Sequence, residues 1–419
     1  MKKICLLVCW IFLLLATVKS APITENEAKN IAMSFCFQKG IDEDLYLSEV
    51  ERDGCYIFNS RQGGYVIVSA DDKVIPILGY SKTGSIRPDM MSFTAFSGWL
   101  NCLEENFDSI LPLMNDSQVD KSEWEKLRSG EMSSSLRCFR CVAPMIKTTW
   151  DQGKPFNSMC PDGSMVGCVA LAMGQIMKYY NYPETGKGYK SYQPFGLSEA
   201  ISADFENTQY KWELMKDSYV RLGSYKTYTD EEADAVATLL FHAGVSVGTL
   251  YALSGSSAFA YANIPRNMVE NFRYAEEPIR YVSRSDYSKE EWMELIFDEL
   301  SNGRPIFYSG NSPESGGHAF VLDGYDATGK VHINWGWRGS DNGYYDIDLL
   351  EGENNFCNNQ SMVIGIMPPS DVNTAIDSTS EEQTIVSIYN ANGVQIEEIQ
   401  KGMNIVKYSD GTIKKIFVR

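Results

Sequence analysis

The apolar positions of this chain recur with two different spacings. At 169, 172, 173, 176 and 180 they follow the period of an α-helix, so we expect a helix over 168–180. The apolar runs at 56–58 and 65–68 flank Gln62-Gly63-Gly64, a pattern that is typical of a β-hairpin. The pattern therefore predicts a chain that contains both helices and strands.

The first twenty residues have the pattern of a secretory signal peptide. Two lysines precede an apolar run at 4–17, and Val18 and Ser20 suit a cleavage site after Ser20. That run is shorter than the roughly 20 residues that a membrane-spanning helix needs, and no later stretch is as long as about 18 apolar residues. We expect an exported protein, at the cell surface or in the medium, without a membrane span once the signal is removed.

Changes of composition divide the rest of the chain. Residues 127–142 are polar, serine-rich and basic, as expected of an exposed connector that proteases reach. Residues 143–367, rich in Gly, Tyr and Trp, form the largest unit. A linker at 368–383 leads to residues 384–419, where short alternating runs are separated by turn pairs that end in glycine. This tail is predicted to be a small all-β unit, either a surface hairpin or a sorting signal.

Composition and charge exclude several functions. The 37 basic and 55 acidic residues give a formal net charge of −18, which argues against a nucleic-acid partner because that binding depends on clustered cations. The chain has only three histidines (His242, His318 and His332), so we expect no multi-histidine metal site. The CxxC motif at 138–141 has no second pair at zinc spacing, which favours loop cysteines or a local redox pair over a metal.

Cys168 is the candidate for a reactive nucleophile. It follows Gly167 at the first turn of the helix predicted at 168–180. The partial positive charge at a helix N-terminus stabilises a thiolate and lowers the pKa of the thiol. A cysteine at such a place is still more often structural than reactive, so the assignment depends on a nearby base.

Two histidines compete for the role of that base. His318 opens a predicted strand directly after two glycines, which permit a close approach of a substrate. His332 lies in a second predicted strand at 330–337 and has no flanking glycines. We therefore favour His318 and expect His332 to be a packed or exposed structural residue.

Three further side chains are suited to the same chemistry. Asn334 could orient the imidazole of His318, and Trp335 could cover that hydrogen bond from water. Gln152 lies in a turn before Cys168, and its amide, together with the Cys168 N–H, could hold a developing oxyanion. A thiolate, an imidazolium and an orienting amide form the cysteine version of a nucleophile–base–orienter set.

A motif also raises the alternative of a serine hydrolase. The segment 244–248 matches G-x-S-x-G around Ser246, which acts as a nucleophile when a strand precedes it and a helix follows. Here 230–242 is typical of a helix and 246–251 of a strand, which is the reverse order. We therefore do not expect Ser246 to be catalytic.

The motifs around the candidate residues, taken in order, resemble those of the streptopain family of papain-like cysteine peptidases. They are Gly167-Cys168-Val169-Ala170 with Gln175-Ile176-Met177-Lys178-Tyr179, Gly316-Gly317-His318-Ala319-Phe320-Val321, and Asn334-Trp335-Gly336-Trp337. The resemblance covers roughly residues 22–367. It implies an α+β fold in which a helical subdomain packs against a twisted antiparallel β-sheet, with the catalytic cleft between them.

The resemblance also implies roles for particular residues, and it implies no metal and no organic cofactor. Cys168 matches the nucleophile, His318 the base and Gln152 the oxyanion glutamine, and Trp335 matches the tryptophan that supports the histidine, with Asn334 beside it. The loop 254–257 is similar to the substrate-binding loop of the family. Ser256 and Gly317 are then the expected substrate contacts, although the bulkier segment 258–261 leaves the subsite preference open.

The ends of the chain gain roles in the same way. The resemblance implies that residues 21–142 are an inhibitory propeptide, which occupies or distorts the cleft until the connector is cut. Residues 384–419 resemble the C-terminal sorting domain of type IX secretion cargo in a shorter form, with the secretion machinery as the implied partner. The resulting hypothesis is a bacterial, secreted cysteine endopeptidase made as a zymogen that acts on proteins or peptides. A transglutaminase-like acyl transferase and a catalytically inactive surface-binding protein are the alternatives.

Overall fold

A computed structural model describes most of the chain between the expected signal peptide and the tail. The signal peptide expected at 1–20 lies outside the described residues, and so does Cys138, whereas Cys141 is described and is disulfide-bonded. The described residues are 23–90, 95–114, 120–130, 141–222, 225–258, 261–312, 316–347, 358–370, 385–390, 395–396, 402–408 and 413–418.

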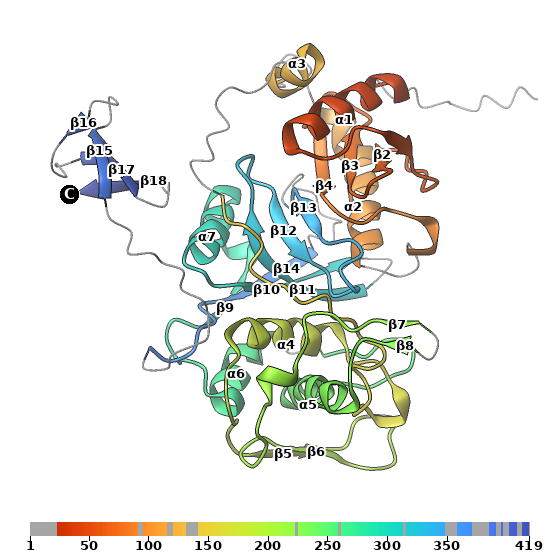
Figure 1. The fold of residues 1–419 in the computed structure, drawn as a ribbon, viewed down its shortest axis with the longest axis vertical. Helices are drawn as coiled ribbons and strands as arrows, with labels where there is room; N and C mark the ends of the chain where they lie inside the picture. Colours follow the sequence, from red (N-terminus) through yellow and green to blue (C-terminus); the bar gives the residue numbers. More distant parts are fainter. Residues whose placement is uncertain are drawn as a thin grey trace, which may run out of the picture.

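The amino-terminal domain packs helices against an antiparallel sheet (Figure 1). Its elements are α1 Glu25–Lys39, β1 Leu45–Leu47, β2 Cys55–Ser60, β3 Tyr65–Ser69, β4 Ile77–Ser81, η1 Pro88–Met90, α2 Ala95–Ile110, η2 Leu111–Leu113 and α3 Ser122–Ser129. The helix α1 begins after Thr24, whose hydroxyl accepts the Glu27 N–H at 3.3 Å, and ends at Gly40 in the left-handed conformation. The predicted hairpin is present, since β2 pairs with β3 and places Ile57 opposite Ile67.

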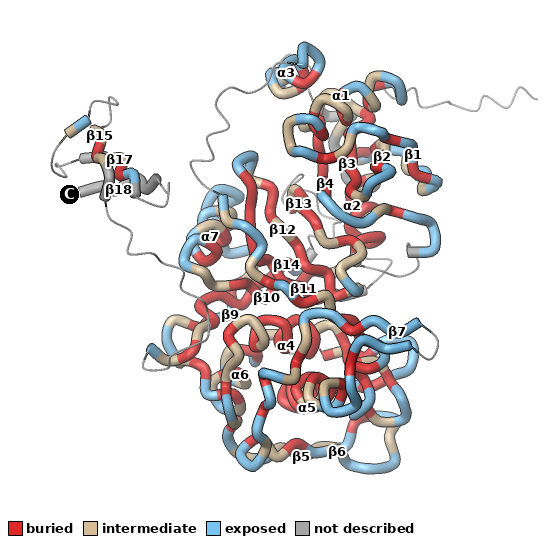
Figure 2. The backbone as a smooth tube through the Cα atoms, in the orientation of Figure 1, coloured by how far each residue is buried: buried red, intermediate tan, exposed pale blue. Residues whose placement is uncertain are grey.

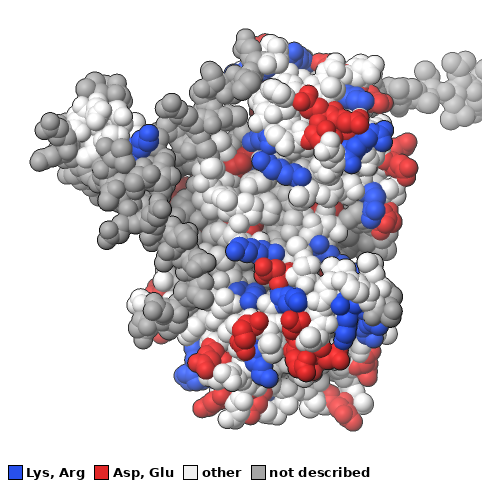
Figure 3. Space-filling view, in the orientation of Figure 1, with Lys and Arg blue, Asp and Glu red and all other residues white. Residues whose placement is uncertain are grey.

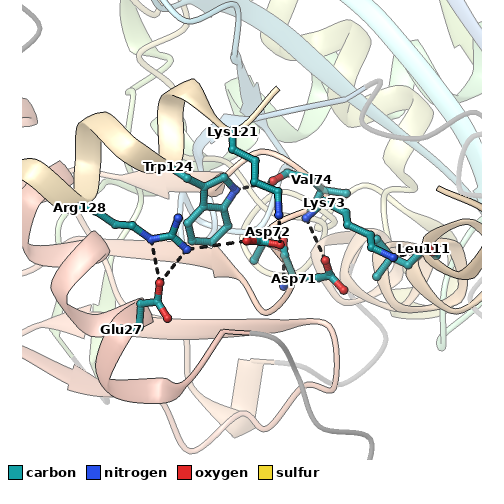
Figure 4. A network of polar contacts seen from close by, with 10 residues as sticks. Glu27, Asp71, Asp72, Lys73, Val74, Leu111, Lys121, Trp124 and Arg128 are labelled. Atoms are coloured by element: carbon teal, nitrogen blue, oxygen red, sulfur yellow. Dashed lines mark hydrogen bonds and ion pairs between the residues drawn. The ribbon is translucent and has the colours of Figure 1, made fainter. Parts of the chain in front are cut away.

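A buried tryptophan and an ion pair hold the short helix α3 on this domain (Figure 4). Trp124 is fully buried and donates its indole N–H to the carbonyl of Val74 at 2.7 Å. Arg128 lies over the Trp124 ring and contacts Glu27 of α1 at 2.7 Å. These contacts anchor a helix whose last residues, 127–129, are the first residues of the expected connector.

The helical part of the central unit is organised around α4 Cys168–Tyr180 and α5 Asp230–Val247. Nearly every residue of α4 is buried, because this helix lies between α5 and the sheet (Figure 2). A capping box starts α5, in which Thr229 accepts the Glu232 N–H and the Glu232 carboxylate accepts the Thr229 N–H. The other elements of this part are η4 Pro161–Gly163, β5 Tyr189–Tyr192, β6 Ile201–Asp204, η5 Trp212–Leu214, β7 Arg221–Leu222, β8 Tyr225–Lys226, η6 Tyr261–Asn263 and α6 Ile264–Phe272.

The other part of the central unit is a sheet with one covering helix. Its elements are β9 Arg280–Ser283, η7 Arg284–Asp286, α7 Lys289–Ser301, β10 Ile306–Ser312, β11 Gly316–Tyr325, β12 Val331–Asn334, β13 Gly343–Tyr345 and β14 Asn358–Ile364. The helix α7 packs on β10 and β11. The central unit therefore has the α+β layout, helices on one side and an antiparallel sheet on the other, that the resemblance implies.

One sheet crosses the boundary between the amino-terminal domain and the central unit. Its strand order is β1-β2-β3-β4-β13-β12-β11-β10-β14-β9, and every neighbouring pair runs antiparallel. At the junction Tyr80 lies opposite Tyr344, and Gly79 lies opposite Tyr345. A side chain at Gly79 would meet the Tyr345 ring at 2.6 Å, so this junction requires glycine. The domain that precedes the connector thus completes the sheet of the central unit.

The hydrophobic core follows the same division. One cluster fills the helical part around α4 and α5, including Trp150 and Leu240. A second cluster joins the two domains, because Phe96 and Trp99 of α2 pack with Trp335 and Tyr345. The interface between the domains is therefore a continuation of the core, with polar contacts such as the Lys39–Asp326 ion pair beside it.

The carboxy-terminal residues form a separate small sheet. Its strands are β15 Ile385–Asn390, β16 Gln395–Ile396, β17 Gly402–Tyr408 and β18 Ile413–Val418, in the order β16-β15-β17-β18. Ile388 and Val406 are buried opposite each other in its centre. The all-β character expected of the tail is confirmed.

The expected strand at 246–251 is wrong. The helix α5 continues to Val247, because Ala243 and Gly244 let it pass close to Tyr251, and it ends at Gly248 in the left-handed conformation. Ser246 is fully buried inside this helix and donates its hydroxyl to the carbonyl of Ala243 at 2.7 Å. The G-x-S-x-G motif is therefore a packing feature.

The described residues also bear on membranes, metals and charge. No helix among them combines the length and the hydropathy that crossing a bilayer requires. No cluster of three or more metal-ligating side chains occurs among them. On the face seen in Figure 3, Lys and Arg are interspersed with Asp and Glu, so this face has no extended basic surface.

Candidate active site

Cys168 is the first residue of α4 and is half-buried. Gly167 precedes it with φ 91°, a backbone conformation that L side chains rarely adopt. A side chain at Gly167 would also meet the carbonyl oxygen of Ser256 at 3.2 Å. Glycine therefore allows the 252–257 loop to lie directly against the start of the helix, beside the thiol.

His318 on β11 is the partner of this thiol. Burial raises the pKa of Cys168, whereas the charge of His318 and a hydrogen bond to its imidazole lower it. The N–H groups of Ala319 and Val169 add hydrogen bonds to the sulfur, so the net pKa of Cys168 is below its usual value. By contrast, burial raises the pKa of Cys160 to about 12. Cys168 therefore has the character of a thiolate nucleophile, and Cys160 that of an inert core residue.

The backbone of Trp335, and not the side chain of Asn334, orients the imidazole. The Nε2 atom of His318 lies 3.3 Å from the carbonyl oxygen of Trp335. This contact engages Nε2, so Nδ1 is the ring nitrogen that remains for the hydrogen bond with Cys168. The indole of Trp337 stacks nearly parallel to the imidazole, with centroids 6.1 Å apart and an interplanar angle of 14°. Trp337 thus covers the ring, a role that the sequence analysis gave to Trp335.

Asn334 has a different task from the one expected. Its side chain is fully buried, donates to the carbonyl of Thr148 at 2.9 Å and accepts the Gly336 N–H at 3.1 Å. It also accepts from Gln175 of α4 at 3.3 Å. These bonds occupy the amide oxygen, so Asn334 joins the sheet to α4 and does not accept a hydrogen bond from the imidazole. The expected hydrogen bond between Asn334 and His318 is not formed.

Trp335 itself belongs to the core between the two domains. Its ring packs against Phe320 at 4.7 Å, Tyr345 at 5.6 Å and Phe96 of α2 at 6.4 Å. The residue supports the histidine through its backbone carbonyl while its indole faces the amino-terminal domain. The stretch that presents the carbonyl to His318 is therefore in contact with that domain.

Gln152 lies in the turn that precedes the catalytic helix. It is buried, its N–H is donated to Asp151 at 2.7 Å, and its carbonyl accepts the Val166 N–H at 3.1 Å. Within the part of the chain that the structure describes, its side-chain amide has no hydrogen-bond partner. Its backbone is thus bound to Val166, the residue directly before Gly167, while the amide stays available.

The two expected substrate contacts flank the catalytic pair. The hydroxyl of Ser256 donates to the Met165 carbonyl at 2.5 Å and accepts the Ala252 N–H at 3.0 Å, so it shapes the loop and is already occupied. Gly317 is exposed beside His318, and a side chain there would meet the Asn311 amide oxygen at 2.7 Å. If these positions contact a substrate as expected, backbone groups rather than side chains would make the contacts.

The remaining histidines are structural. His332 lies 2.6 Å from Asp323, a fully buried carboxylate that also accepts the Ile146 N–H at 2.8 Å. Asp323 therefore connects Ile146, near the start of the central unit, to His332 in the sheet. His242 is buried against Tyr210, and burial lowers its pKa to about 4, so it remains neutral.

A helical half that carries an activated thiol and a sheet half that carries its imidazole define a papain-like cysteine peptidase. Comparison with known families agrees: the model of the Peptidase C10 family matches residues 150–345, and that of the Spi protease inhibitor matches residues 20–107. Streptopain from Streptococcus pyogenes is 30% identical over 392 residues, which cover 82% of this chain and 92% of streptopain. The chain belongs to the Peptidase C10 family and is a cysteine peptidase whose amino-terminal domain is of the Spi inhibitor type.

Two further relatives extend the comparison. The thiol protease/hemagglutinin PrtT of Porphyromonas gingivalis is 30% identical over 405 residues, 88% of this chain, but the chain spans only 45% of that protein. The solved structure of a fragment of Prevotella intermedia prointerpain A is 33% identical, with a TM-score of 0.64 over 78% of this chain and 99% of the fragment. The match includes the amino-terminal domain, which agrees with its packing onto the sheet.

Proposed function

We propose that this chain is an exported endopeptidase zymogen that hydrolyses peptide bonds in proteins through Cys168 and His318. The observation that carries the proposal is the hydrogen-bonded thiol–imidazole pair at the start of α4, with the pKa of Cys168 held below its usual value by His318. A thiolate at that place is the nucleophile that acyl transfer needs at neutral pH.

The reaction follows from the positions of these groups. His318 holds the proton of Cys168, and the thiolate attacks the peptide carbonyl, so that an S–C bond forms and the carbonyl oxygen becomes negative. The amide of Gln152 and the Cys168 N–H stabilise this oxyanion. His318 then passes its proton to the leaving amine as the C–N bond breaks. Water, deprotonated by His318, hydrolyses the thioester and restores the thiol.

The residues around the imidazole keep it in the productive state. The Trp335 carbonyl accepts the Nε2–H of His318, which reserves Nδ1 for the sulfur. Trp337 covers the ring from one side. The backbone groups of Ser256 and Gly317 flank the pair and hold the extended substrate.

The amino-terminal domain is the inhibitor of the same chain in this proposal. Ser81 of β4 donates to the Asn342 carbonyl at 2.7 Å, and the Asn342 side chain accepts the Trp335 N–H at 3.1 Å. Phe96 packs on the Trp335 ring. These contacts link the domain to the residue whose carbonyl orients His318, so docking of the domain acts on the catalytic histidine. Cleavage of the connector within 127–142 would release it.

The proposal also includes export of the chain and its delivery to the cell surface. The signal peptide at 1–20 would direct the chain out of the cytoplasm, and the tail sheet at 384–419 would address it to a secretion machinery. The tail is supported as a unit of its own by its separate four-stranded sheet and by the buried pair Ile388 and Val406.

The test uses the chain from residue 21 onward with a reductant and unfolded casein. We expect loss of the amino-terminal domain and cleavage of casein, and neither in Cys168→Ala. Cys160→Ala is the matched control, because burial makes that thiol inert, and it should behave as wild type. Wild type that leaves casein intact, even after an added protease has cut the connector, would contradict the proposal. Adding an excess of a primary amine distinguishes a peptidase from an acyl transferase, because the transferase would attach the amine to its products.

A further inference from the structure

Arg338 has an unusual backbone for a long side chain. Its φ is 54°, in the left-handed region, and it stands between Gly336 and Gly339, which have φ values of 78° and 77°. Arg338 directly follows Trp337, the residue that stacks on His318. A non-glycine residue in this conformation is held there by its surroundings, and such residues gather at functional sites.

Two contacts hold Arg338 against the turn that carries Gln152. Its backbone N–H is donated to the carbonyl of Trp150 at 3.1 Å. Its guanidinium Nε donates to a carboxylate oxygen of Asp151 at 2.5 Å. The Asp151 side chain is only 10% exposed, whereas that of Arg338 is 65% exposed, so the ion pair lies at the surface end of a buried carboxylate.

The second oxygen of Asp151 continues the connection. It accepts the N–H of Gln152 at 2.7 Å, and the carbonyl of Gln152 accepts the Val166 N–H at 3.1 Å. One carboxylate therefore holds both the guanidinium of Arg338 and the peptide plane from which the Gln152 side chain extends. A rotation of that carboxylate would move the amide of Gln152 relative to the sulfur of Cys168.

We propose that Arg338 is a positioning residue for the peptidase reaction, acting through Asp151 to place the oxyanion-binding amide of Gln152. The inference rests on the role proposed above for Gln152. An oxyanion donor contributes only when it meets the developing charge at hydrogen-bond distance, so small displacements reduce kcat while leaving substrate binding unchanged. Because the pair is partly exposed, its loss should cost about three- to tenfold in kcat, less than the 10²–10³-fold typical of removing an oxyanion donor.

The test compares Arg338→Gly, Asp151→Asn and Gln152→Ala in self-processed enzyme made from the full chain. Glycine accepts the φ of position 338, so Arg338→Gly removes the ion pair without straining the backbone. Arg266→Gln is the matched control, because Arg266 forms an exposed ion pair with Glu270 at 2.8 Å on α6. Each variant is measured for kcat and KM on a peptide substrate and for the rate at which iodoacetamide alkylates Cys168. Alkylation needs the thiolate but no oxyanion donor.

The expected result is a lower kcat for Arg338→Gly and Asp151→Asn, with KM and the alkylation rate as in wild type and Arg266→Gln. The double variant Gln152→Ala/Arg338→Gly should be no slower than Gln152→Ala alone, and Arg338→Lys should recover part of the kcat. If Arg338→Gly keeps the wild-type kcat while Gln152→Ala is impaired, the inference about Arg338 is overturned and the role of Gln152 stands. Additive losses, or an equal fall in alkylation, would also overturn it. A Gln152→Ala enzyme with full kcat would overturn the role of Gln152 itself.

Discussion

The ion pair between Lys39 and Asp326 is the most testable contact between the inhibitor-type domain and the catalytic unit. Lys39 at the end of α1 lies 2.8 Å from Asp326, and both side chains are nearly buried, 13% and 9% exposed. Tyr80 donates to the same carboxylate oxygen at 2.8 Å, and the Lys39 ammonium lies 5.0 Å from the Tyr80 ring centroid. The substitution Lys39→Met keeps the aliphatic stem and removes only the charge.

The free-energy cost of Lys39→Met depends on the hydrogen bonds that Asp326 retains. Breaking a buried ion pair by removing one partner costs about 3–5 kcal/mol, because the other charge is left without compensation. Asp326 retains the Tyr80 hydroxyl, the Thr328 N–H and hydroxyl, and the Lys330 N–H. We therefore expect a cost nearer to 2–3 kcal/mol, which corresponds to a roughly 30- to 150-fold weaker association of the two domains.

The assay uses the full chain carrying Cys168→Ala, cut in the connector by an added protease, and measures the dissociation constant of the two parts. Arg61→Gln is the control, because the Arg61–Asp44 pair is 65% and 66% exposed and should contribute under 1 kcal/mol. A Lys39→Met complex that dissociates no more than the Arg61→Gln complex would refute the reasoning.

The same ion pair gives a pH dependence. Burial raises the pKa of Asp326, but the Lys39 charge and the hydrogen bonds from Lys39, Thr328 and Tyr80 outweigh it and lower the pKa. A lowered pKa in the docked state means that this contribution is present above the ordinary carboxyl pKa of about 4 and is lost as pH falls through the lowered value. The association constant of the cut zymogen should therefore fall in strong acid, and less so in Lys39→Met.

Three further substitutions test other parts of the account. Asp341 is buried, and burial raises its pKa to about 7, so between the usual carboxyl pKa and about pH 7 its ionisation progressively destabilises the fold. Asp341→Asn should raise the melting temperature at pH 8 and leave it unchanged at pH 4; an equal effect at both would contradict this. Trp124→Ala should cost about 3–5 kcal/mol of stability locally and expose the α3 amides to hydrogen exchange, whereas unchanged exchange would show that α3 is held otherwise. Trp337→Leu should slow both hydrolysis and alkylation about tenfold, because the His318 ring loses its cover; full alkylation would count against that role.

The contact between Cys168 and His318 could be predicted because the signals for both residues are local. Cys168 follows a glycine at the start of a clear helical period, and His318 follows two glycines at the start of a strand. The β2–β3 hairpin and the small tail sheet were also predictable, since turn residues separate their alternating runs. Each of these signals lies in one continuous stretch of chain, such as residues 55–69 for the hairpin and 385–418 for the tail sheet.

The features that the sequence could not indicate depend on contacts between distant residues. Asn334 turns toward Thr148 and Gln175 rather than His318, and only the packing of the sheet on α4 decides this. The W-G-W motif offered two tryptophans, and the fold places Trp337 on the imidazole while Trp335 joins the core. Local pattern also favoured a strand around Ser246, where burial of small residues extends α5 instead.

The union of the two domains in one sheet has the same origin. The pairing of Tyr80 with Tyr344 joins residues that are far apart in the chain. Neither a hydrophobic period nor a turn motif in the sequence predicts this pairing. It also explains how an inhibitor-type domain reaches the catalytic site, since β13 and the residues before it carry the contacts to Trp335.

The most direct test of the central claim is the pH dependence of Cys168 alkylation in the processed enzyme. If His318 maintains a thiolate, the rate of reaction with iodoacetamide should reach half its maximum below the ordinary thiol pKa of about 8.5. In His318→Ala the midpoint should move up, because burial is then opposed only by the N–H groups of Ala319 and Val169. A wild-type midpoint at the ordinary value, or one that His318→Ala leaves in place, would contradict the account.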